Sequence, residues 1–452
     1  MRPGAVPADS GPPENNSHFP ADCHSEQSEE FMDIKDLYTL FLHSAGVNTD
    51  TRTIRENQLF IALKGENFDG NAFALQALEA GACCAVVSDS VQARDPRLVK
   101  VPDTLATLQE LASYHRRQLA IPVIGLTGTN GKTTTKELVR TILAARYRVV
   151  ATEGNLNNDI GVPLSVLKIG PEAQMAIIEM GASHPEDLRP LLAVAQPTHG
   201  LITNVGKAHL EGFGSFEGVK HAKGLLYDWL KEHEGIAFAN GDDSVLQEML
   251  WEREMTCIAY GAKEVKLLPS SPEHPFLRIA FPDDILETRL VGAYNAANVL
   301  AALKIAWFFG VPDAEARAAI ASYVPSNNRS QLVKTEKNTL IVDAYNANPS
   351  SMAVALDNLA CTEGRRVALL GAMRELGADS QEEHRKVVAR LAGTEAYLVG
   401  EEFIQAAVGS GIPAFNTSEE LAAYLQAHPL QGCVVLVKGS RSTRMEKLIP
   451  SL

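Results

Sequence analysis

Short apolar runs alternate with amphipathic segments through the middle of the chain. Pro122–Leu126 contains only apolar residues, and in the following Lys132–Arg146 the residues Leu138, Ile142 and Leu143 recur at helical spacing. Such a pair predicts a strand buried on both faces and a helix that covers it. Three further short apolar runs end at glycine or polar residues, namely Ala176–Met180, Gly200–Thr203 and Gly235–Ala239. The pattern predicts a parallel sheet with covering helices.

The same alternation restarts near residue 325. The predicted strands there are Leu340–Asp343, Val367–Gly371, Ala396–Gly400 and Val434–Lys438, and the predicted helices are Ser351–Leu359, Gln381–Ala392 and Glu419–Ala427. Near the beginning the elements are shorter, with strands predicted at Leu59–Leu63 and Cys84–Val87 and a helix at Ala72–Ala80. We therefore expect an α/β protein with three domains, at residues 32–103, 104–324 and 325–452.

The first 31 residues differ from the rest of the chain. They are rich in Pro, Ser, Glu and Asn and lack the apolar stretch of a secretory signal. This composition predicts a disordered tail. Since the regular pattern begins at Met32, we expect either that Met32 is the biological start or that residues 1–31 are dispensable.

The charge and the cysteine content restrict the partners and the compartment that we expect for this protein. The formal net charge is −14, which does not favour a nucleic-acid partner or an anionic membrane surface. No apolar run approaches the ~18 residues of a membrane span. The six cysteines show no C-x-x-C pair and no zinc-type spacing, so we expect reduced thiols in a cytoplasmic protein.

A glycine-containing loop follows the first strand of the predicted central sheet. The loop, Gly128-Thr-Asn-Gly131, precedes Lys132 and Thr133 at the start of a predicted helix. In this setting backbone N–H groups converge on phosphate oxygens, a lysine reaches the outer phosphates, and a threonine hydroxyl can bind Mg²⁺. The strict spacing G-x-x-x-x-G-K-[ST] is absent because position 126 is Leu. The alternative is a glycine turn before an ordinary helix.

The loop sequence and several later segments resemble the Mur ligase family and its relative, folylpolyglutamate synthase. The segments appear in the order that this family shows: Gly128–Thr134, Thr152–Pro163, Ile177–Gly181, Thr203–Leu210, Ala222–Gly224 and Gly292–Asn298. The chain departs from the family at three places. Tyr294 stands where histidine is usual, Ala372 replaces an aspartate, and Leu225 replaces a common glutamate. The resemblance implies a central ATPase domain with a phosphate loop, a small domain that binds a UDP-linked substrate, and a Rossmann-like C-terminal domain.

The resemblance also implies roles for individual residues. Those implied to bind ATP are Gly128, Thr129, Asn130, Gly131, Lys132, Thr133, Thr134, Tyr294, Asn295, Asn298, Arg329 and Asp343. Two Mg²⁺ ions would be bound by Thr133, Glu179, His209 and Lys223, with Lys223 as a carbamate, because an unmodified lysine has no acceptor atom. Lys132, Lys223, His209 and Arg329 are the implied catalytic residues, and Arg329 would reach the phosphates from the third domain.

Within the family, three segments resemble the D-alanyl-D-alanine-adding members: Asp343–Met352, Leu370–Gly377 and Val437–Arg441. The implied reaction joins D-alanyl-D-alanine to a UDP-N-acetylmuramoyl-tripeptide through an acyl phosphate, by a protein that we expect to be monomeric. The implied substrate-binding residues are Asp50, Thr51 and Arg52 for the UDP part, Asn155, Asn157 and Asn158 for the muramoyl peptide, and Tyr345, Asn346 and Asn348 for the dipeptide.

Two other interpretations stay open at this point. One keeps the family and changes the substrate, as in a folate-polyglutamate ligase or another muramoyl-peptide ligase. The other is a nucleotide-binding regulator without ligase activity. Lys223 could also be an ordinary surface lysine, and the segment Asn346–Pro349 could serve only as a turn that caps a helix. Phosphate release that depends on D-alanyl-D-alanine would distinguish the ligase from the regulator.

Overall fold

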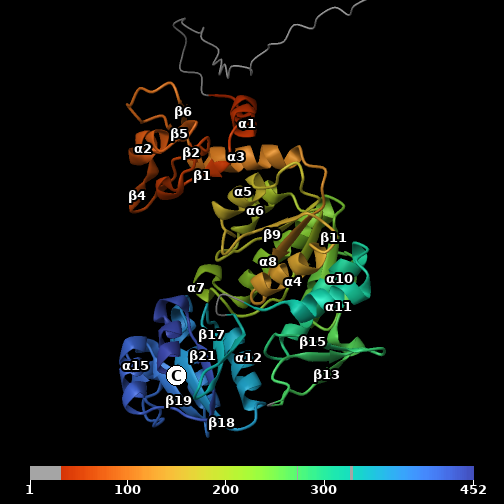
Figure 1. Cartoon of the computed structure of the whole chain (residues 1–452), viewed down its shortest axis with the longest axis vertical. Coiled ribbons are helices and arrows are strands. Elements are labelled where there is room, and N and C mark those ends of the chain that lie inside the picture. Colours follow the sequence, from red (N-terminus) through yellow and green to blue (C-terminus); the bar gives the residue numbers. More distant parts are fainter. Residues whose placement is uncertain (1–31, 272, 326–328) are drawn as a thin grey trace, which may run out of the picture.

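The computed structural model describes residues 32–271, 273–325 and 329–452. Figure 1 shows three α/β parts that follow one another along the long axis in chain order, from red and orange through yellow and green to blue. The predicted tail at residues 1–31 lies outside the described residues. In the part of the chain that the structure describes, no helix is long and apolar enough to cross a membrane.

The first part is a four-stranded parallel sheet in the order β1-β2-β5-β6. Its strands are β1 (Val47–Asn48), β2 (Leu59–Ile61), β5 (Cys84–Ser88) and β6 (Leu98–Val101), and its helices are α1 (Ile34–Leu42) and α2 (Ala74–Glu79). A short hairpin, β3 (Lys64–Gly65) and β4 (Phe68–Asp69), extends from it. The two predicted strands are confirmed. The predicted helix begins as a 3-10 turn, Gly70–Phe73, and becomes α-helical at Ala74.

Helix α3 (Thr104–Arg117) joins this part to the central one. It packs against α1 on one side and against α5 (Gly161–Leu167) and α6 (Leu188–Ala195) on the other. The buried Arg116 donates hydrogen bonds to the carbonyls of Ala195, Leu119 and Gln196. Because its guanidinium satisfies backbone acceptors that include the last turn of α6, this contact fixes α3 to the central part.

The central part contains a six-stranded, all-parallel sheet in the order β12-β11-β10-β7-β9-β8. The strands are β7 (Val123–Thr127), β8 (Val149–Ala151), β9 (Met175–Glu179), β10 (His199–Ile202), β11 (Ile236–Asn240) and β12 (Cys257–Tyr260). The further helices are α4 (Lys132–Leu143), α7 (Leu210–Phe213), α8 (Phe216–Glu232), α9 (Ser244–Glu252), α10 (Asn295–Phe308) and α11 (Asp313–Ser322). All four strands predicted here are confirmed.

The strand order places the phosphate loop at the switch point of this sheet. The chain runs from β7 to β8 and β9 on one side and then crosses to β10, β11 and β12 on the other. In open α/β sheets, ligands bind outside the carboxyl ends of the strands at such a point. The loop after β7, the end of β9 and the segment after β10 therefore meet at one edge.

A small antiparallel sheet follows, and its strands were not predicted. It consists of β13 (Lys266–Leu268), β14 (Arg278–Ala280) and β15 (Ile285–Glu287). Each strand has three residues and is partly exposed. Such short runs carry too little alternation to be recognised as strands.

The C-terminal part has a six-stranded sheet in the order β16-β17-β21-β18-β19-β20, parallel except for β16. The strands are β16 (Gln331–Lys334), β17 (Thr339–Asp343), β18 (Arg365–Gly371), β19 (Glu395–Val399), β20 (Ala414–Phe415) and β21 (Cys433–Lys438). The helices are α12 (Pro349–Ala360), α13 (Ser380–Arg390), α14 (Glu401–Ala406) and α15 (Ser418–Ala427). The four predicted strands and three predicted helices are confirmed, whereas the edge strands β16 and β20 and helix α14 were not predicted.

Candidate active site

The phosphate loop has the backbone geometry that its glycines permit. Gly128 has φ +140° and Gly131 has φ +80°, both in the region that favours glycine. A Cβ on Gly128 would overlap the Thr203 hydroxyl, and a Cβ on Gly131 would lie 2.7 Å from Asn298 Oδ1. The loop is therefore packed tightly against its neighbours, with α4 beginning at Lys132 directly after it. This is the strand–loop–helix arrangement expected of an anion-binding loop.

Lys132 folds back over this loop. Its Nζ donates to the carbonyl of Gly128 at 2.6 Å and to that of Thr129 at 3.2 Å. Burial lowers the pKa of Lys132, Glu179 opposes this effect, and the charge of Arg329 lowers the pKa further. Lys132 and Arg329 both line the cavity described below, and an anionic phosphate group there would relieve the repulsion between their charges.

Glu179 ends strand β9 beside the start of α4, where it is 2 % exposed. Its Oε1 accepts hydrogen bonds from Thr133 Oγ1 at 3.2 Å and from Asn157 Nδ2 at 3.0 Å. Among the described residues, no donor is hydrogen-bonded to its Oε2, which lies 3.6 Å from the amine of Lys136, a lysine with 0 % exposure. A carboxylate and a hydroxyl that face each other supply the oxygen ligands that Mg²⁺ prefers, so these residues fit an ion at this place.

The other two predicted metal ligands come from the segment after β10 and from α8. His209 precedes α7 and contacts Glu375 of the C-terminal part. Lys223, on α8, is 3 % exposed, and its Nζ donates to the carbonyl of Ala182 at 3.3 Å. Among the described residues, no group of three or more His, Cys, Asp or Glu side chains is placed to hold a metal. A second ion would therefore need an additional ligand, such as a carbamate on Lys223.

The pKa of the Lys223 amine is strongly lowered. Burial is the largest cause, the nearby charge of Lys132 lowers the value further, and Asp187 opposes both, giving a pKa of about 7. For His209, burial also lowers the pKa, Glu375 raises it, and the charges of Lys132 and Lys223 lower it. The mutual influence of these groups shows that Lys132, Lys223 and His209 share one electrostatic environment.

Tyr294, Asn295 and Asn298 form the turn and first residues of α10. The Tyr294 hydroxyl lies 2.7 Å from Ser330 Oγ, and burial raises its pKa. Asn298 Nδ2 donates to Asn295 Oδ1 at 2.9 Å, and Asn298 Oδ1 accepts from Thr135 Oγ1 at 3.1 Å. The two asparagines therefore fix α10 against the phosphate-loop helix, while the tyrosine ring lines the cavity.

The C-terminal part contributes the end of β17 and the start of α12. The Arg329 guanidinium lies over the Tyr345 ring, 3.6 Å from its centre. The fully buried Lys438 donates to Asp343 Oδ2 at 2.5 Å and to the carbonyl of Asn346 at 3.1 Å. Lys438 thus holds the predicted dipeptide segment in place. The residues at 326–328, which precede Arg329, lie outside the described residues.

One cavity of about 1030 Å³ brings these groups together. The predicted site residues that line it are Thr129, Asn130, Gly131, Lys132, Thr133, Thr134, Asn155, Asn157, Asn158, Glu179, His209, Tyr294, Asn295, Asn298, Arg329, Asp343, Tyr345, Asn346 and Asn348. Gly128 and Lys223 are not among the lining residues. The cavity is thus shared between the central and the C-terminal parts.

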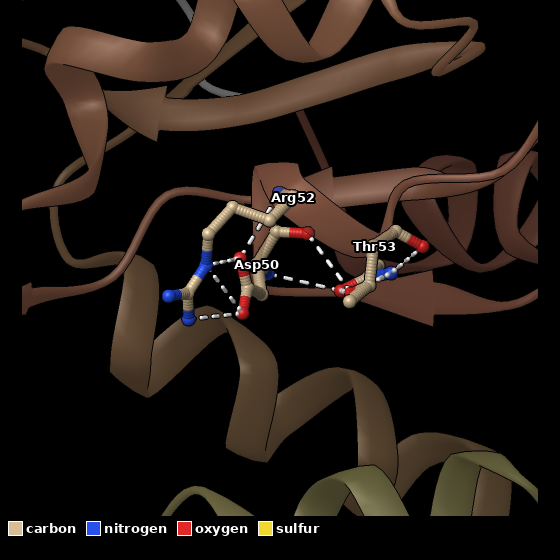
Figure 2. Close-up of polar contacts among 4 residues, drawn as sticks. Asp50, Arg52 and Thr53 are labelled. Carbon is tan, nitrogen blue, oxygen red and sulfur yellow. Dashed lines mark hydrogen bonds and ion pairs between the residues drawn. The ribbon is translucent and has the colours of Figure 1, made fainter.

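Asp50, Thr51 and Arg52 lie on the N-terminal part and are not among the residues that line this cavity. Figure 2 shows Asp50 and Arg52 with the polar contacts between them. Asp50 caps a 3-10 turn by accepting a hydrogen bond from the Arg52 backbone at 3.0 Å. The Arg52 side chain folds back over the same carboxylate, with hydrogen bonds of 2.9 Å and 2.7 Å. These bonds lower the pKa of Asp50 to about 2. The Arg52 side chain is 86 % exposed, so its guanidinium is accessible from solvent although it is paired with Asp50.

Four residues of the site were not singled out from the sequence. Lys136 lies three residues after Thr133, on the buried face of α4 that also contains Val139. A lysine at an otherwise apolar position of a helix is unusual, and this was the feature of the sequence that could have indicated its role. Asn204, Glu375 and Lys438 lie inside segments that the family resemblance had marked, but no role was assigned to them.

Together, the loop, the buried acid and the cationic groups define a nucleotide-binding α/β protein equipped for phosphoryl transfer. Comparison with known families gives three matches: the Mur ligase family catalytic domain at residues 43–116, the Mur ligase middle domain at 126–306 and the Mur ligase glutamate ligase domain at 328–441.

Individual relatives agree over nearly the whole length. The UDP-N-acetylmuramoyl-tripeptide–D-alanyl-D-alanine ligase of Escherichia coli (strain K12) is 36% identical over 423 residues, covering 90% of this chain and 93% of the relative. The ligase of the same name from Bacillus subtilis (strain 168) is 32% identical, with the same coverage. The chain therefore belongs to the Mur ligase family, and it is an ATP-dependent ligase.

Solved structures of Mur ligases are also similar to this chain over nearly its whole length. A crystal structure of MurF from Acinetobacter baumannii has a TM-score of 0.82 at 30% identity and covers 94% of this chain and 99% of its own. The MurF ligase from Thermotoga maritima in complex with ADP has a TM-score of 0.79 at 28% identity, covering 91% and 97%. The family resemblance and the fold class predicted from the sequence are confirmed, and the interpretation as a regulator without ligase activity is not supported.

Proposed function

We propose that this chain joins D-alanyl-D-alanine to a UDP-N-acetylmuramoyl-tripeptide, with ATP as the energy source, and so forms the UDP-muramoyl-pentapeptide precursor of peptidoglycan. The observation that carries the proposal is the shared cavity. It is lined both by the phosphate loop and Glu179 and by the segment Asp343–Asn348 of the C-terminal part. The names of the relatives point to the same substrates.

In the first step, the tripeptide carboxylate attacks the γ-phosphorus of ATP. A bond forms between a carboxylate oxygen and phosphorus, the bond to the β-γ bridging oxygen breaks, and ADP leaves. The attacking and the attacked groups are both anionic, so cations must offset their repulsion. Lys132 and Arg329 line the cavity and are close enough for the charge of one to lower the pKa of the other. We assign to both the neutralisation of the transferring phosphate.

In the second step, the neutral amine of D-alanyl-D-alanine attacks the acyl phosphate. A carbon–nitrogen bond forms, the bond between the carbonyl carbon and the phosphate oxygen breaks, and the departing phosphate or a nearby base accepts the amine proton. Asn346 and Tyr345 line the cavity beside Arg329 and could hold the dipeptide. An amide N–H can donate to the terminal carboxylate of the dipeptide. Asn155, Asn157 and Asn158 line the cavity on the side of the central part, and we assign them to the muramoyl peptide.

The metal sites are part of the proposal. Thr133 and Glu179 would hold one Mg²⁺ ion, and His209 with a carbamate on Lys223 would hold another. Bound Mg²⁺ would stabilise negative charge on the phosphates. Formation of the carbamate requires a neutral amine, because the nitrogen lone pair bonds to the carbon of CO₂ as a proton is released. A buried Lys223 with a pKa of about 7 supplies a neutral amine at physiological pH.

Further assignments follow from the same proposal. Asp50, Thr51 and Arg52 would bind the UDP part, since the exposed guanidinium of Arg52 can pair with a diphosphate. We propose domain limits at residues 32–103, 104–324 and 325–452, a monomeric state and a cytoplasmic location, where UDP-linked precursors and ATP would be available. The tail at residues 1–31 is proposed to be dispensable.

The test is phosphate release with ATP, Mg²⁺ and UDP-N-acetylmuramoyl-tripeptide, with and without D-alanyl-D-alanine, followed by mass spectrometry of the product. We expect release only when all components are present, and a pentapeptide product. L-alanyl-L-alanine and free glutamate are the matched controls. Turnover with glutamate in place of the dipeptide would overturn the proposed substrate. The variant Lys132→Met should abolish release, because it removes the cation that faces the phosphates.

A further inference from the structure

The side chain of Asn130 connects the phosphate loop to the C-terminal part. The backbone of Asn130 is fixed from the central part: its N–H donates to Asn204 Oδ1 at 3.0 Å, and its carbonyl accepts from Thr203 Oγ1 at 2.7 Å and from Asn204 Nδ2 at 2.9 Å. Its side-chain Oδ1 accepts a hydrogen bond of 2.9 Å from Nδ2 of Asn348, which lies 218 positions away in the chain.

The Asn348 amide is also fixed on its own side. It is the N-cap of α12, and its Oδ1 accepts from the backbone N–H of Ser351 at 2.8 Å. The backbone N–H of Asn348 in turn donates to Ser351 Oγ at 3.1 Å, which completes a capping box. Because Oδ1 is held by the cap, Nδ2 faces the loop in a fixed orientation. An amide nitrogen carries two N–H groups, so one serves Asn130 and the second can serve a ligand.

A second contact supports the same junction. The backbone N–H of Lys207, in the segment after β10, donates to Ser350 Oγ at 3.0 Å. Gly206 is so close to this serine that a Cβ would lie 2.8 Å from Ser350 Oγ. The first turn of α12 therefore rests against both the phosphate loop and the segment that supports it. A shift of the loop would be passed directly to α12.

We propose that Asn348 is a positioning residue that couples the nucleotide-bound phosphate loop to the binding of D-alanyl-D-alanine at the start of α12. This inference rests on the proposed function. A nucleotide bound beside the Asn130 side chain would restrain Asn130 Oδ1, and through it the Asn348 amide and the dipeptide segment. Coupling of this kind is reciprocal, so the dipeptide should strengthen nucleotide binding by the same factor.

A double-mutant cycle tests the coupling. Asn348→Ser retains an oxygen that can cap α12 but is too short to reach Asn130, and Asn130→Ala removes the acceptor. Asn130→Ala is expected to raise the KM for D-alanyl-D-alanine about fivefold, which corresponds to one neutral hydrogen bond, with kcat less affected. Asn348→Ser should raise this KM at least as much, because it also removes the N–H that can serve the ligand. The double variant should have the same KM as Asn348→Ser alone, because the contact that Asn130→Ala removes is already absent in that variant.

The decisive variant is Asn130→Ala, because Asn130 lies on the phosphate loop whereas the measured quantity is the KM for the dipeptide. ADP affinity is measured by calorimetry, with and without the dipeptide, as the reciprocal readout. Ser351→Ala is the matched control, because it removes one half of the capping box and leaves the contact between Asn130 and Asn348 intact. It should lower the melting temperature without changing the KM for the dipeptide.

Three results would contradict the coupling. The effects of the two substitutions on the KM could multiply in the double variant, or Asn130→Ala could change the affinity for ADP without changing the KM for the dipeptide. The third is a rise of the KM in Ser351→Ala as large as that in Asn130→Ala. If the wild-type protein forms product with D-alanyl-D-alanine but the double-mutant cycle shows no coupling, only the proposed coupling is refuted and the proposed function stands. If the wild-type protein shows no turnover with D-alanyl-D-alanine, the proposed function fails, and the coupling to this dipeptide fails with it.

Discussion

Lys136 offers the sharpest test of how the buried acid of the site is held. Its side chain is fully buried, its amine donates to the carbonyl of Thr152 at 2.6 Å, and it lies 3.6 Å from Glu179 Oε2. The variant Lys136→Met keeps most of the side-chain volume and removes the charge. It leaves the Glu179 carboxylate, which is 2 % exposed, without its nearest counter-charge and the Thr152 carbonyl without this donor.

The expected loss of stability follows from these contacts. Removing one partner of a buried ion pair costs about 3–5 kcal/mol, because the remaining charge stays buried and uncompensated. For a unit of the size of the central domain, this corresponds to a fall in melting temperature of roughly 10 °C. The measurement is thermal unfolding by calorimetry in the absence of nucleotide.

The same substitution at an exposed ion pair is the matched control. Lys168 pairs with Glu153 at 2.6 Å, with side-chain exposures of 48% and 70%. Lys168→Met should cost only ~0–1 kcal/mol, because water screens the pair. The double variant Lys136→Met/Glu179→Gln should regain much of the lost stability. If Lys136→Met proved as stable as Lys168→Met, the argument that Lys136 compensates Glu179 would be refuted.

Three further changes test other parts of the site. Gly128→Ala should weaken ADP binding more than tenfold by calorimetry, because its Cβ would overlap the Thr203 hydroxyl at a φ of +140°, whereas Gly154→Ala, with no atom near its Cβ, should leave ADP binding unchanged. In CO₂-free buffer, Lys223→Met should raise the melting temperature most below pH 7 and progressively less as the pH rises toward 10.5, because the amine has a pKa of about 7 when folded and 10.5 when unfolded; a difference that does not depend on pH would contradict this. Arg52→Ala should raise the KM for the UDP-linked substrate at least tenfold, as expected for the loss of a charge-assisted bond, while the melting temperature and the KM for ATP stay unchanged.

The elements that were predicted correctly have a common physical basis. A strand segment buried on both faces must be largely apolar, as in β7 and in Val367–Gly371 of β18, so its sequence reveals it without knowledge of its neighbours. The phosphate loop was recognisable for a similar local reason, since its backbone geometry needs glycine at fixed positions. The strands β13, β14 and β15 were missed because three partly exposed residues carry no such pattern.

The contacts between distant segments could not be derived in this way. Nothing near Asn348 in the sequence indicates that its amide contacts Asn130, and the turn before α12 explains that asparagine fully as a helix cap. The same holds for Glu375, whose carboxylate meets His209 only because the C-terminal part is docked against the segment after β10. Local sequence patterns could therefore predict which residues belong to the site, but not which of their side chains contact one another. These contacts join the nucleotide loop to the C-terminal part. The coupling between nucleotide binding and dipeptide binding is therefore the property that local sequence patterns reveal least. The double-mutant cycle on Asn130 and Asn348 measures this coupling directly.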